Sequence, residues 1–374
     1  MKVLHICKVF LPPKGGVQVV VDWLVKGLSE NGVTSEVFTT YKKNEIFNER
    51  EFSHVKRYKS WVEILSMPIA PRLIFAIKNN LKHYDLACVH YPFPLADLAI
   101  TISRSSDCKL VVYWHSEIVS QAKTSILVAI LTKIMLRRAS KIVCSSPNLI
   151  EHSPLLRQFR HKCVVIPFGM PTTYELEKEL PKLSVPSTSK TIVFIGRHVP
   201  YKGIETLIYA FKKLCEQKKY KSFRLILIGK GPRFQHHCEL VNNAELEGRI
   251  CFLPNLNDNE LRAHLREARC LVLPSHLPSE AFALVQLEAM ALGRPIINTQ
   301  LNSGVPWVAR DGKEAITVKP NNAESLLAAI AKICDDDELV DKLGNAARLR
   351  FNNEFTHPQF CQRTYKLFKE ICEL

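Results

Sequence analysis

The sequence lacks the features of a membrane-spanning or secreted protein. Its longest apolar run, residues 126–136, is interrupted by Lys133 and is well short of the ~20 residues that a spanning helix needs. The apolar segment at the start of the chain ends at Lys8, which is too early for a signal peptide. The 12 cysteines include no C-x-x-C pair and no zinc-like spacing with histidine. We therefore expect a reduced, cytoplasmic protein that, if it meets a membrane, lies on its surface.

The sequence also lacks internal repeats, low-complexity tracts and any nucleic-acid-binding motif or aromatic–basic repeat, which disfavours a nucleic acid as partner. Positive charge is abundant and uneven. The net charge of the 374 residues is +15, and residues 1–173 hold 23 Lys and Arg against 12 Asp and Glu, whereas the remainder holds 28 against 24. A basic first half favours an anionic partner such as a membrane surface or a lipid pyrophosphate. A basic surface without a specific partner is the alternative.

Apolar segments of strand length alternate with helical patterns along the whole chain. This alternation predicts an α/β protein whose parallel sheets are covered on both faces. The length predicts at least two domains. We place a first domain at 1–172, a linker rich in Pro, Ser, Thr, Glu and Lys at 173–189, and a second domain at 190–356. The predicted strands are residues 3–9, 35–40, 86–90, 109–114, 141–145, 162–167, 191–195, 224–228, 250–253 and 270–273, with another from residue 295.

Two loops carry residues suited to a phosphate. Gly15 and Gly16 lie between the first strand and a helical pattern, and glycines let backbone amides approach an anion closely. In the second domain, Arg197 and Lys202 lie between a strand and a helix. Arg binds two oxygens and Lys adds a point charge, so the pair suits a pyrophosphate. The alternatives are a tight packing turn for the glycines and solvated loop cations for Arg197 and Lys202.

Glu280 and Glu288 flank the start of a predicted helix over residues 282–292. If the segment is largely helical, the two carboxylates are ~12 Å apart along the axis and ~80° apart around it. They cannot act as a close pair, but they can hold the two ends of an elongated ligand such as a sugar nucleotide, with its diphosphate over the helix N-terminus. An ordinary amphipathic helix is the alternative.

Residues 279–297 (SEAFALVQLEAMALGRPII) resemble the E-x7-E signature of retaining glycosyltransferases of family 4. The G-R-x-x-x-x-K-G pattern at 196–203, the G-x-G-P turn from Gly229 and the glycine loop resemble further motifs of that family. The resemblance implies the GT-B fold, in which two Rossmann-like doubly wound domains face each other across a cleft. It also implies that a C-terminal helix, 357–374, packs back on the first domain, and that transfer proceeds without a metal and with retention of configuration.

The resemblance also implies roles for individual residues. Glu280 lies at the donor sugar and Glu288 at the ribose. His115, at the end of a strand, positions substrate rather than abstracting a proton, and His90 is a weaker candidate. No role is assigned to Phe168, which stands where the family usually has asparagine. The diphosphate is met by Arg197, Lys202, Gly15 and Gly16 and by the amides of Phe282, Ala283 and Leu284, and Gly229 lies near the nucleotide.

Two segments of the first half combine basic and bulky apolar residues. Residues 57–83 are expected to form interrupted helices, and Arg137-Arg138 ends another apolar helical run. Such segments are typical of an interfacial membrane contact. Helices that pack on their own sheet with snorkelling lysines are the alternative. The Asp335–Asp337 cluster lies between helical patterns, so we interpret it as helix capping and expect no metal site and no cofactor.

Within the family, residues 279–312 most resemble bacterial mannosyltransferases that build O-antigen or other surface polysaccharide. We therefore expect transfer of a hexose, mannose from GDP-mannose, to a lipid-pyrophosphate-linked glycan at the inner face of the cytoplasmic membrane. A glucosyl-, galactosyl- or GlcNAc-transferase that uses a UDP-sugar would carry the same motifs. A GT-B sugar-nucleotide epimerase and a non-catalytic binder of anionic surfaces are further alternatives.

Overall fold

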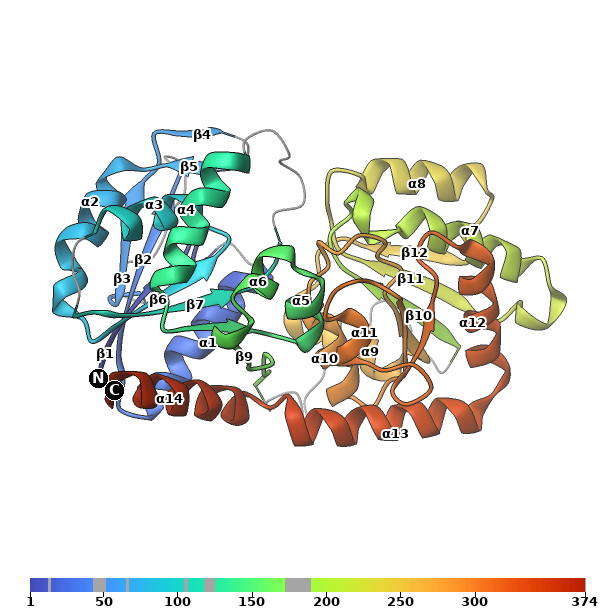
Figure 1. Cartoon of the computed structure of the whole chain (residues 1–374). Coiled ribbons are helices and arrows are strands. Elements are labelled where there is room, and N and C mark those ends of the chain that lie inside the picture. Colours follow the sequence, from blue (N-terminus) through green and yellow to red (C-terminus); the bar gives the residue numbers. More distant parts are fainter. Residues whose placement is uncertain are drawn as a thin grey trace. The chain divides into compact units, whose positions relative to one another are not determined.

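The computed structural model describes residues 1–12, 15–42, 52–64, 67–103, 107–117, 125–171 and 190–373. The chain forms two compact units (Figure 1), one of residues 1–169 with 357–374 and the other of residues 170–356. The linker predicted at 173–189 lies outside the described residues.

The first unit is built on a parallel sheet with the strand order β3-β2-β1-β6-β7-β8-β9 among the described residues. Its central strands are buried, apart from the partly buried Lys109 at the start of one of them, as expected where helices cover both faces. The order reverses at β1, so that β2 and β6 flank it, which is the arrangement of a doubly wound fold. The strands are β1 (Lys2–Ile6), β2 (Thr34–Tyr41), β3 (Val55–Lys59), β6 (Leu86–Tyr91), β7 (Lys109–Trp114), β8 (Lys141–Cys144) and β9 (Cys163–Val165).

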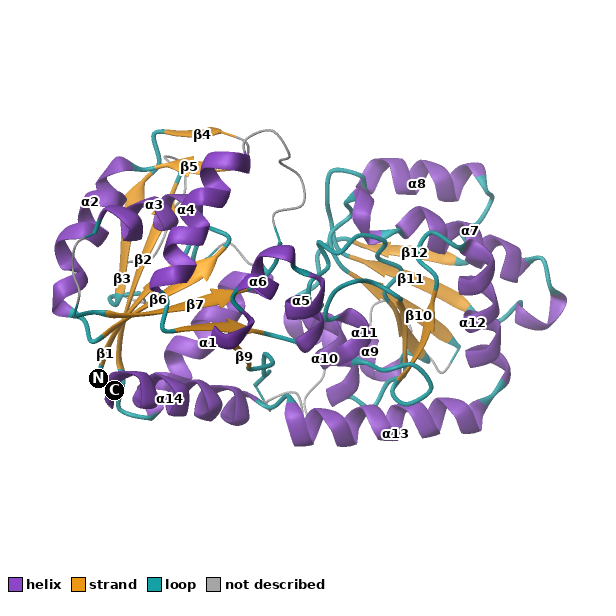
Figure 2. Ribbon diagram, viewed as in Figure 1, coloured by secondary structure: helices purple, strands orange, loops and turns teal. Residues whose placement is uncertain are grey.

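Helices flank this sheet on both faces (Figure 2). Several begin with proline, whose fixed φ suits the first helical position. The C-terminal helix packs on α1: a Cβ added to Gly27 would lie 2.2 Å from Cys361 Sγ, and His357 Nε2 is 2.8 Å from the Trp23 carbonyl oxygen. The helices are α1 (Gly16–Glu30), α2 (Pro71–Asn80), α3 (Pro94–Ile102), α4 (Ser125–Arg138), α5 (Pro147–His152), α6 (Pro154–Gln158) and α14 (His357–Glu373).

The prediction of interrupted helices over 57–83 is wrong for the first part of that segment. Strand β3 ends at Lys59, and an antiparallel pair, β4 (Val62–Ile64) and β5 (Met67–Ile69), precedes helix α2. Of the basic residues predicted to lie on helices, Arg57 and Lys59 are on β3, where Arg57 is half-buried and Lys59 is exposed. Arg138 at the end of α4 donates to the carbonyl oxygen of Ser103, 2.8 Å away. It therefore closes the C-terminus of α3 within the fold.

The second unit has a parallel sheet with the order β12-β11-β10-β13-β14-β15 among its described residues. Here the order reverses at β10. Strand β15 was not predicted from the sequence, because it is short and two of its residues are partly exposed. The strands are β10 (Thr191–Ile195), β11 (Arg224–Ile228), β12 (Ile250–Leu253), β13 (Cys270–Val272), β14 (Ile296–Thr299) and β15 (Ala315–Val318).

Helices α8 and α12 each pack against α7, and α10 packs with α9 and α13. Side-chain caps fix several starts: Asn257 and Glu260 form a capping box at α9, and Asp336 accepts from the Leu339 amide at α13. The interpretation of the aspartate cluster as capping is thus confirmed for Asp336, whereas Asp335 pairs with Lys219 and Asp337 with Arg269. The bounds are α7 (Ile204–Cys215), α8 (Phe234–Asn243), α9 (Asp258–Glu267), α10 (Leu284–Ala291), α11 (Val305–Val308), α12 (Ala323–Asp335) and α13 (Asp337–Glu354).

The helix of the E-x7-E segment begins two residues later than predicted. It starts at Leu284, after Ala283 with φ 59° and ψ 80°. Glu280 therefore lies on the turn before α10, and the helical spacing calculated for Glu280 and Glu288 does not apply to the first half of the motif. The 12 cysteines are all free.

Candidate active site

Three loops of the second unit meet where adjacent strands end. They follow β11, β10 and β13, and their contacts require glycine. Gly229 has φ 123°, and a Cβ there would lie 2.3 Å from the Gly196 carbonyl oxygen. Gly203 has φ 67°, and its Cβ would lie 2.1 Å from the Pro274 carbonyl oxygen. The carboxyl edge of an open parallel sheet is where ligands bind in such folds. The structure thus brings together the predicted Arg197–Lys202 loop, Gly229 and the Glu280 turn.

Lys202 and Glu280 form an ion pair at this junction. Lys202 Nζ lies 2.5 Å from Glu280 Oε2, and the two side chains are only 11% and 10% exposed. Ser275 Oγ donates to the same carboxylate oxygen over 3.0 Å. Removing two charges from water is costly, and close pairing with an added hydrogen bond offsets that cost. The pair places a fixed cation and a fixed carboxylate side by side at the edge of the sheet.

The turn before α10 is held by a buried amide network. Gln286 Nε2 donates to the Phe282 carbonyl oxygen over 3.1 Å, and Asn298 Nδ2 donates to Gln286 Oε1 over 3.0 Å. Both amide side chains are fully buried. The network fixes the backbone that leads from Phe282 through Ala283 into the first turn of α10.

The remaining donor-side candidates differ in burial. Arg197 is exposed on the loop after β10, and Glu288 is partly buried in the middle of α10. Next to Arg197, the His198 imidazole is fully buried, and its Nδ1 lies 2.9 Å from His237 Nδ1. Burial and the neighbouring His237 lower the pKa of His198 to about 4, so His198 is neutral and braces the loop. The pair of His198 and His237 was not predicted from the sequence.

In the first unit, the predicted glycines begin helix α1. Gly15 is the N-cap with φ −160°, makes no side-chain cap and accepts from the Val19 amide over 3.1 Å. Gly16 is the first residue of the helix, and no acidic residue lies in its first turn. The amides of this turn and the positive end of the helix dipole suit an anion.

His115 follows β7 and is buried in a cluster of rings. Its Nε2 lies 2.9 Å from His90 Nδ1, and His90 Nε2 lies 3.1 Å from His5 Nδ1. Burial lowers the pKa of both His5 and His115 to about 3. The Phe168 ring stacks on His115 with centroids 5.4 Å apart. These histidines lie on β1, on β6 and directly after β7, which are neighbours in the sheet. In the sequence, the signal for this cluster is a histidine near the end of each of these strands.

Among the residues that the structure describes, one group of three has ligand atoms placed for a metal ion: His5, Cys88 and His90, whose atoms lie within 4.8 Å of one another. Burial raises the pKa of the Cys88 thiol well above its ordinary value, so the thiol stays protonated. The group is thus neutral at ordinary pH.

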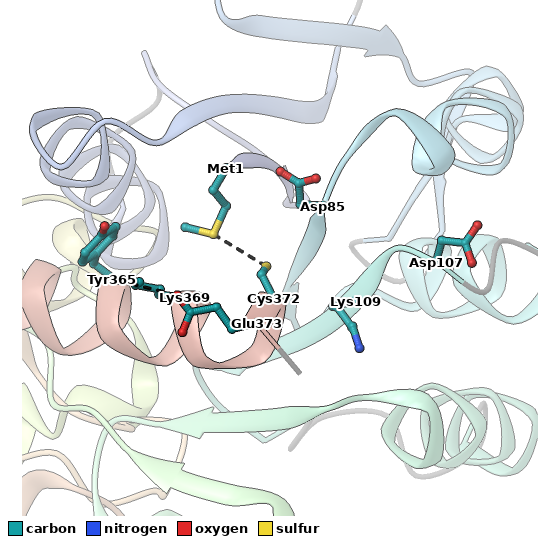
Figure 3. Close-up of a pocket in the computed structure, with 8 residues that line it drawn as sticks. All are labelled: Met1, Asp85, Asp107, Lys109, Tyr365, Lys369, Cys372 and Glu373. Atoms are coloured by element: carbon teal, nitrogen blue, oxygen red, sulfur yellow. Dashed lines mark hydrogen bonds and ion pairs between the residues drawn. The ribbon is translucent and has the colours of Figure 1, made fainter.

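A cavity of about 450 Å³ opens at the amino-terminal ends of the strands of the first sheet (Figure 3). Asp85 precedes β6, Lys109 begins β7, and Cys372 on α14 points toward Met1 with its Sγ 3.7 Å from Met1 Sδ. His115 and the start of α1 lie instead at the carboxyl ends of the strands. The cavity is therefore separate from the candidate site residues of this unit.

Comparisons with known proteins cover both units. The model described as Glycosyltransferase Family 4 matches residues 14–174, and that described as Glycosyl transferases group 1 matches residues 176–350. O-antigen chain mannosyltransferase C of Escherichia coli is 28% identical over 382 residues, which covers 100% of this chain and 99% of that protein. The D-rhamnosyltransferase WbpZ of Pseudomonas aeruginosa is 26% identical and covers 95% and 92%.

Solved structures give the same fold. A sucrose-phosphate synthase from Thermosynechococcus elongatus has a TM-score of 0.78 at 20% identity and covers 99% of this chain and 98% of that one. HepE from Anabaena, in complex with UDP and glucose, has a TM-score of 0.78 at 19% identity and covers 99% and 100%. Together with the two parallel sheets, these likenesses confirm the predicted GT-B fold. No helix among the described residues is long and apolar enough to cross a bilayer.

Proposed function

Because this chain belongs to the family-4 glycosyltransferases with the GT-B fold, we propose that it transfers mannose from GDP-mannose to a lipid-pyrophosphate-linked glycan. The reaction serves synthesis of O-antigen or another surface polysaccharide at the inner face of the cytoplasmic membrane. The full-length similarity to an O-antigen chain mannosyltransferase supports this choice, as does the E-x7-E segment that carries the sequence resemblance.

The observation that carries the proposal is the buried pair of Lys202 and Glu280 where the three loops meet. Lys202 contacts the donor diphosphate at the edge of the sheet, and the exposed Arg197 binds it from the loop after β10. Among the described residues, Lys202 and Ser275 both contact Oε2 of the Glu280 side chain, and Oε1 accepts a hydroxyl of the donor sugar. The amides of Phe282, Ala283 and Leu284 meet phosphate, and Glu288 binds the ribose.

The transfer step breaks the bond between the anomeric carbon and the diphosphate oxygen, and a new bond forms from that carbon to an acceptor hydroxyl oxygen. The hydroxyl proton passes to the departing diphosphate, which leaves from the same face, so configuration is retained. Arg197 and Lys202 stabilise the charge that develops on the leaving group. They do so in place of a metal ion.

The first unit positions the acceptor. The amides at Gly15 and Gly16 lie near the diphosphate and the acceptor, and Gly229 lies near the nucleotide in the second unit. His115 holds a substrate oxygen and takes no proton from it, because its low pKa makes it a weak base.

The first unit also contacts the membrane. Exposed apolar side chains lie on its β4 strand and helices α2 and α4: Val62 is 52% exposed, Phe75 61% and Ile126 78%. Arg72 and Lys78 of α2 are exposed as well. Apolar side chains beside cations suit an interface with anionic lipid.

Donor binding and transfer test the proposal separately. Purified protein is screened by thermal shift against GDP, UDP, dTDP and ADP and their common sugar derivatives, since a ligand that binds the folded state raises the midpoint. GDP and GDP-mannose are expected to raise it selectively. Glu280→Gln should then retain the GDP shift and lose transfer, whereas Glu247→Gln, the same change at an exposed site, should retain both.

A selective shift with UDP would replace mannose by glucose, galactose or GlcNAc and leave the site residues in place. Full turnover in Glu280→Gln would remove Glu280 from the mechanism. The similarity to a D-rhamnosyltransferase makes a rhamnose donor the second candidate. It is distinguished by comparing the two sugars on one GDP carrier.

A further inference from the structure

Three imidazoles form one hydrogen-bonded line in the first unit. The His5 and His90 ring centroids are 5.4 Å apart at an interplanar angle of 22°, with 3.1 Å between the facing nitrogens. The His90 and His115 centroids are 5.2 Å apart at 29°, with 2.9 Å between nitrogens. In both pairs the centroid distance exceeds the distance between the facing nitrogens by about two ring radii, as expected when these nitrogens lie on the line that joins the ring centres. The N–H of one ring and the lone pair of the next are therefore directed at each other.

This geometry distinguishes the line from a metal site. Two imidazoles that share a metal direct their lone pairs at a third point, whereas His5 Nδ1 and His90 Nε2 are directed at each other. Cys88 Sγ lies 3.8 Å from His90 Nε2, and its thiol can either donate weakly to that nitrogen or accept weakly from it. This contact therefore does not decide which nitrogen of His90 carries the proton.

The protons of the line can be arranged in two ways. A neutral imidazole carries one N–H, so all three rings are protonated either on Nδ1 or on Nε2. Two end nitrogens, His5 Nε2 and His115 Nδ1, are both buried and have no hydrogen-bond partner among the described residues. A buried N–H without an acceptor is costly, so the favoured arrangement puts the outer N–H at the end where a ligand can accept it.

We propose that His5 and His90 are positioning residues that hold His115 as its Nδ1–H tautomer, which donates to a substrate oxygen. His5 Nδ1–H donates to His90 Nε2, and His90 Nδ1–H donates to His115 Nε2. His5, at 0% exposed, lies deeper than His115 at 4%, which agrees with this direction. The inference rests on the proposed role of His115 at the substrate, and it makes the recognised group a hydrogen-bond acceptor: a sugar hydroxyl or a phosphate oxygen.

Two substitutions of His90 separate its two contacts. In His90→Asn, the amide occupies the place of Nδ1 and keeps a donor to His115 while it loses His5. In His90→Gln, the amide occupies the place of Nε2 and keeps His5 while it loses His115. Both leave one polar contact, so their melting temperatures should be similar. We expect His90→Gln to lower kcat about tenfold or more and His90→Asn to lower it far less. Equal losses of kcat in the two variants would overturn the proposal.

Nitrogen NMR of protein labelled with ¹⁵N-histidine reads the tautomers without any turnover, with the His115→Asn and His5→Asn variants used for assignment. The Nδ1–H pattern is expected for His115 in the wild type and in His90→Asn, and a mixture in His90→Gln. An Nε2–H pattern for His115 in the wild type would overturn the proposal, as would a stoichiometric metal ion found by elemental analysis. Wild-type protein that transfers no sugar would instead remove the proposed function, and the spectra would still decide the tautomer.

Discussion

Lys202 is the residue whose burial most constrains the donor site. Its partner Glu280 is as deeply buried as Lys202 itself, so removal of either partner leaves an uncompensated charge, at a cost of about 3–5 kcal/mol. Loss of activity in a single variant would therefore not separate chemistry from folding.

We expect Lys202→Met to lower kcat about 100-fold or more, because a donor aimed at developing charge is worth that much, and to lower the free energy of unfolding. The double variant Lys202→Met with Glu280→Gln should regain stability and remain inactive. Lys221→Met, the same change at an exposed residue, is the control. Activity restored together with stability in the double variant would mean that the pair is only structural.

Asp97 is a buried carboxyl of the first unit with a raised pKa. Burial raises its pKa from 3.8 to about 7, although Thr132 Oγ1 donates to its Oδ2 over 2.6 Å. The unfolded chain loses this proton at lower pH than the folded protein. Its contribution to stability is therefore complete below pH 3.8 and is lost as the pH rises through about 7.

Asp97→Asn should remove that loss while keeping an acceptor for Thr132. Between pH 4 and 7 the unfolding free energy of the wild type should fall, relative to Asp97→Asn, by at most about 1.4 kcal/mol per pH unit. Urea unfolding of both proteins across this range measures the difference. A difference that is independent of pH would show that Asp97 is ionised in the folded protein.

At the level of elements, the turn into α10 is the strained part of the donor site. Ala283 adopts φ 59°, where an L-residue pays about 1–2 kcal/mol. Ala283→Gly relieves that strain but adds about 0.5–1 kcal/mol of backbone entropy. We therefore expect a gain in stability of at most about 1 kcal/mol, with transfer unchanged because the amide remains.

The β-branched variant Ala283→Val should destabilise the protein and slow transfer, since its side chain disfavours this backbone region further. Denaturant unfolding and kcat of the two variants give the comparison. A valine variant as stable and as active as the wild type would show that the turn relaxes out of the left-handed region.

Elements with strong local patterns were predictable from the sequence. The buried strands β7, β10 and β11 have the predicted bounds because apolar runs of that length in a covered parallel sheet leave little alternative. Strands β3, β4 and β5 were missed because most of their described side chains are half-exposed or exposed. In addition, β3 pairs with β2, which lies some distance away in the sequence. The late start of α10 follows from the backbone of Ala283, which no local propensity indicates.

The site was predictable only in part for the same reason. The motifs located Lys202 and Glu280, but their ion pair depends on the meeting of two loops that are far apart in sequence. The line from His5 to His115 joins residues 110 positions apart, and only the sheet order brings them together. The charged residues of this site could be located from sequence motifs, whereas its histidine line could be recognised only from the strand order of the sheet.

At the scale of the whole molecule, each unit carries a distinct part of the proposed reaction. The second holds the cations and carboxylates for a sugar nucleotide, and the first holds the α1 N-terminus, the histidine line and the exposed apolar residues. This division agrees with the two family models, which meet near residue 175. Neither unit contains all of the residues proposed for transfer, so activity requires the full chain.

Analysis of the transfer product tests the central claim most directly. The full-length protein is incubated with α-configured GDP-mannose and a lipid-pyrophosphate-linked glycan in the presence of EDTA, and the product is examined by mass spectrometry and NMR. The account predicts addition of one or more hexose residues in α linkage, at a rate that EDTA does not change. A β-linked product, or activity that disappears with EDTA and returns with a divalent cation, would contradict the proposed mechanism.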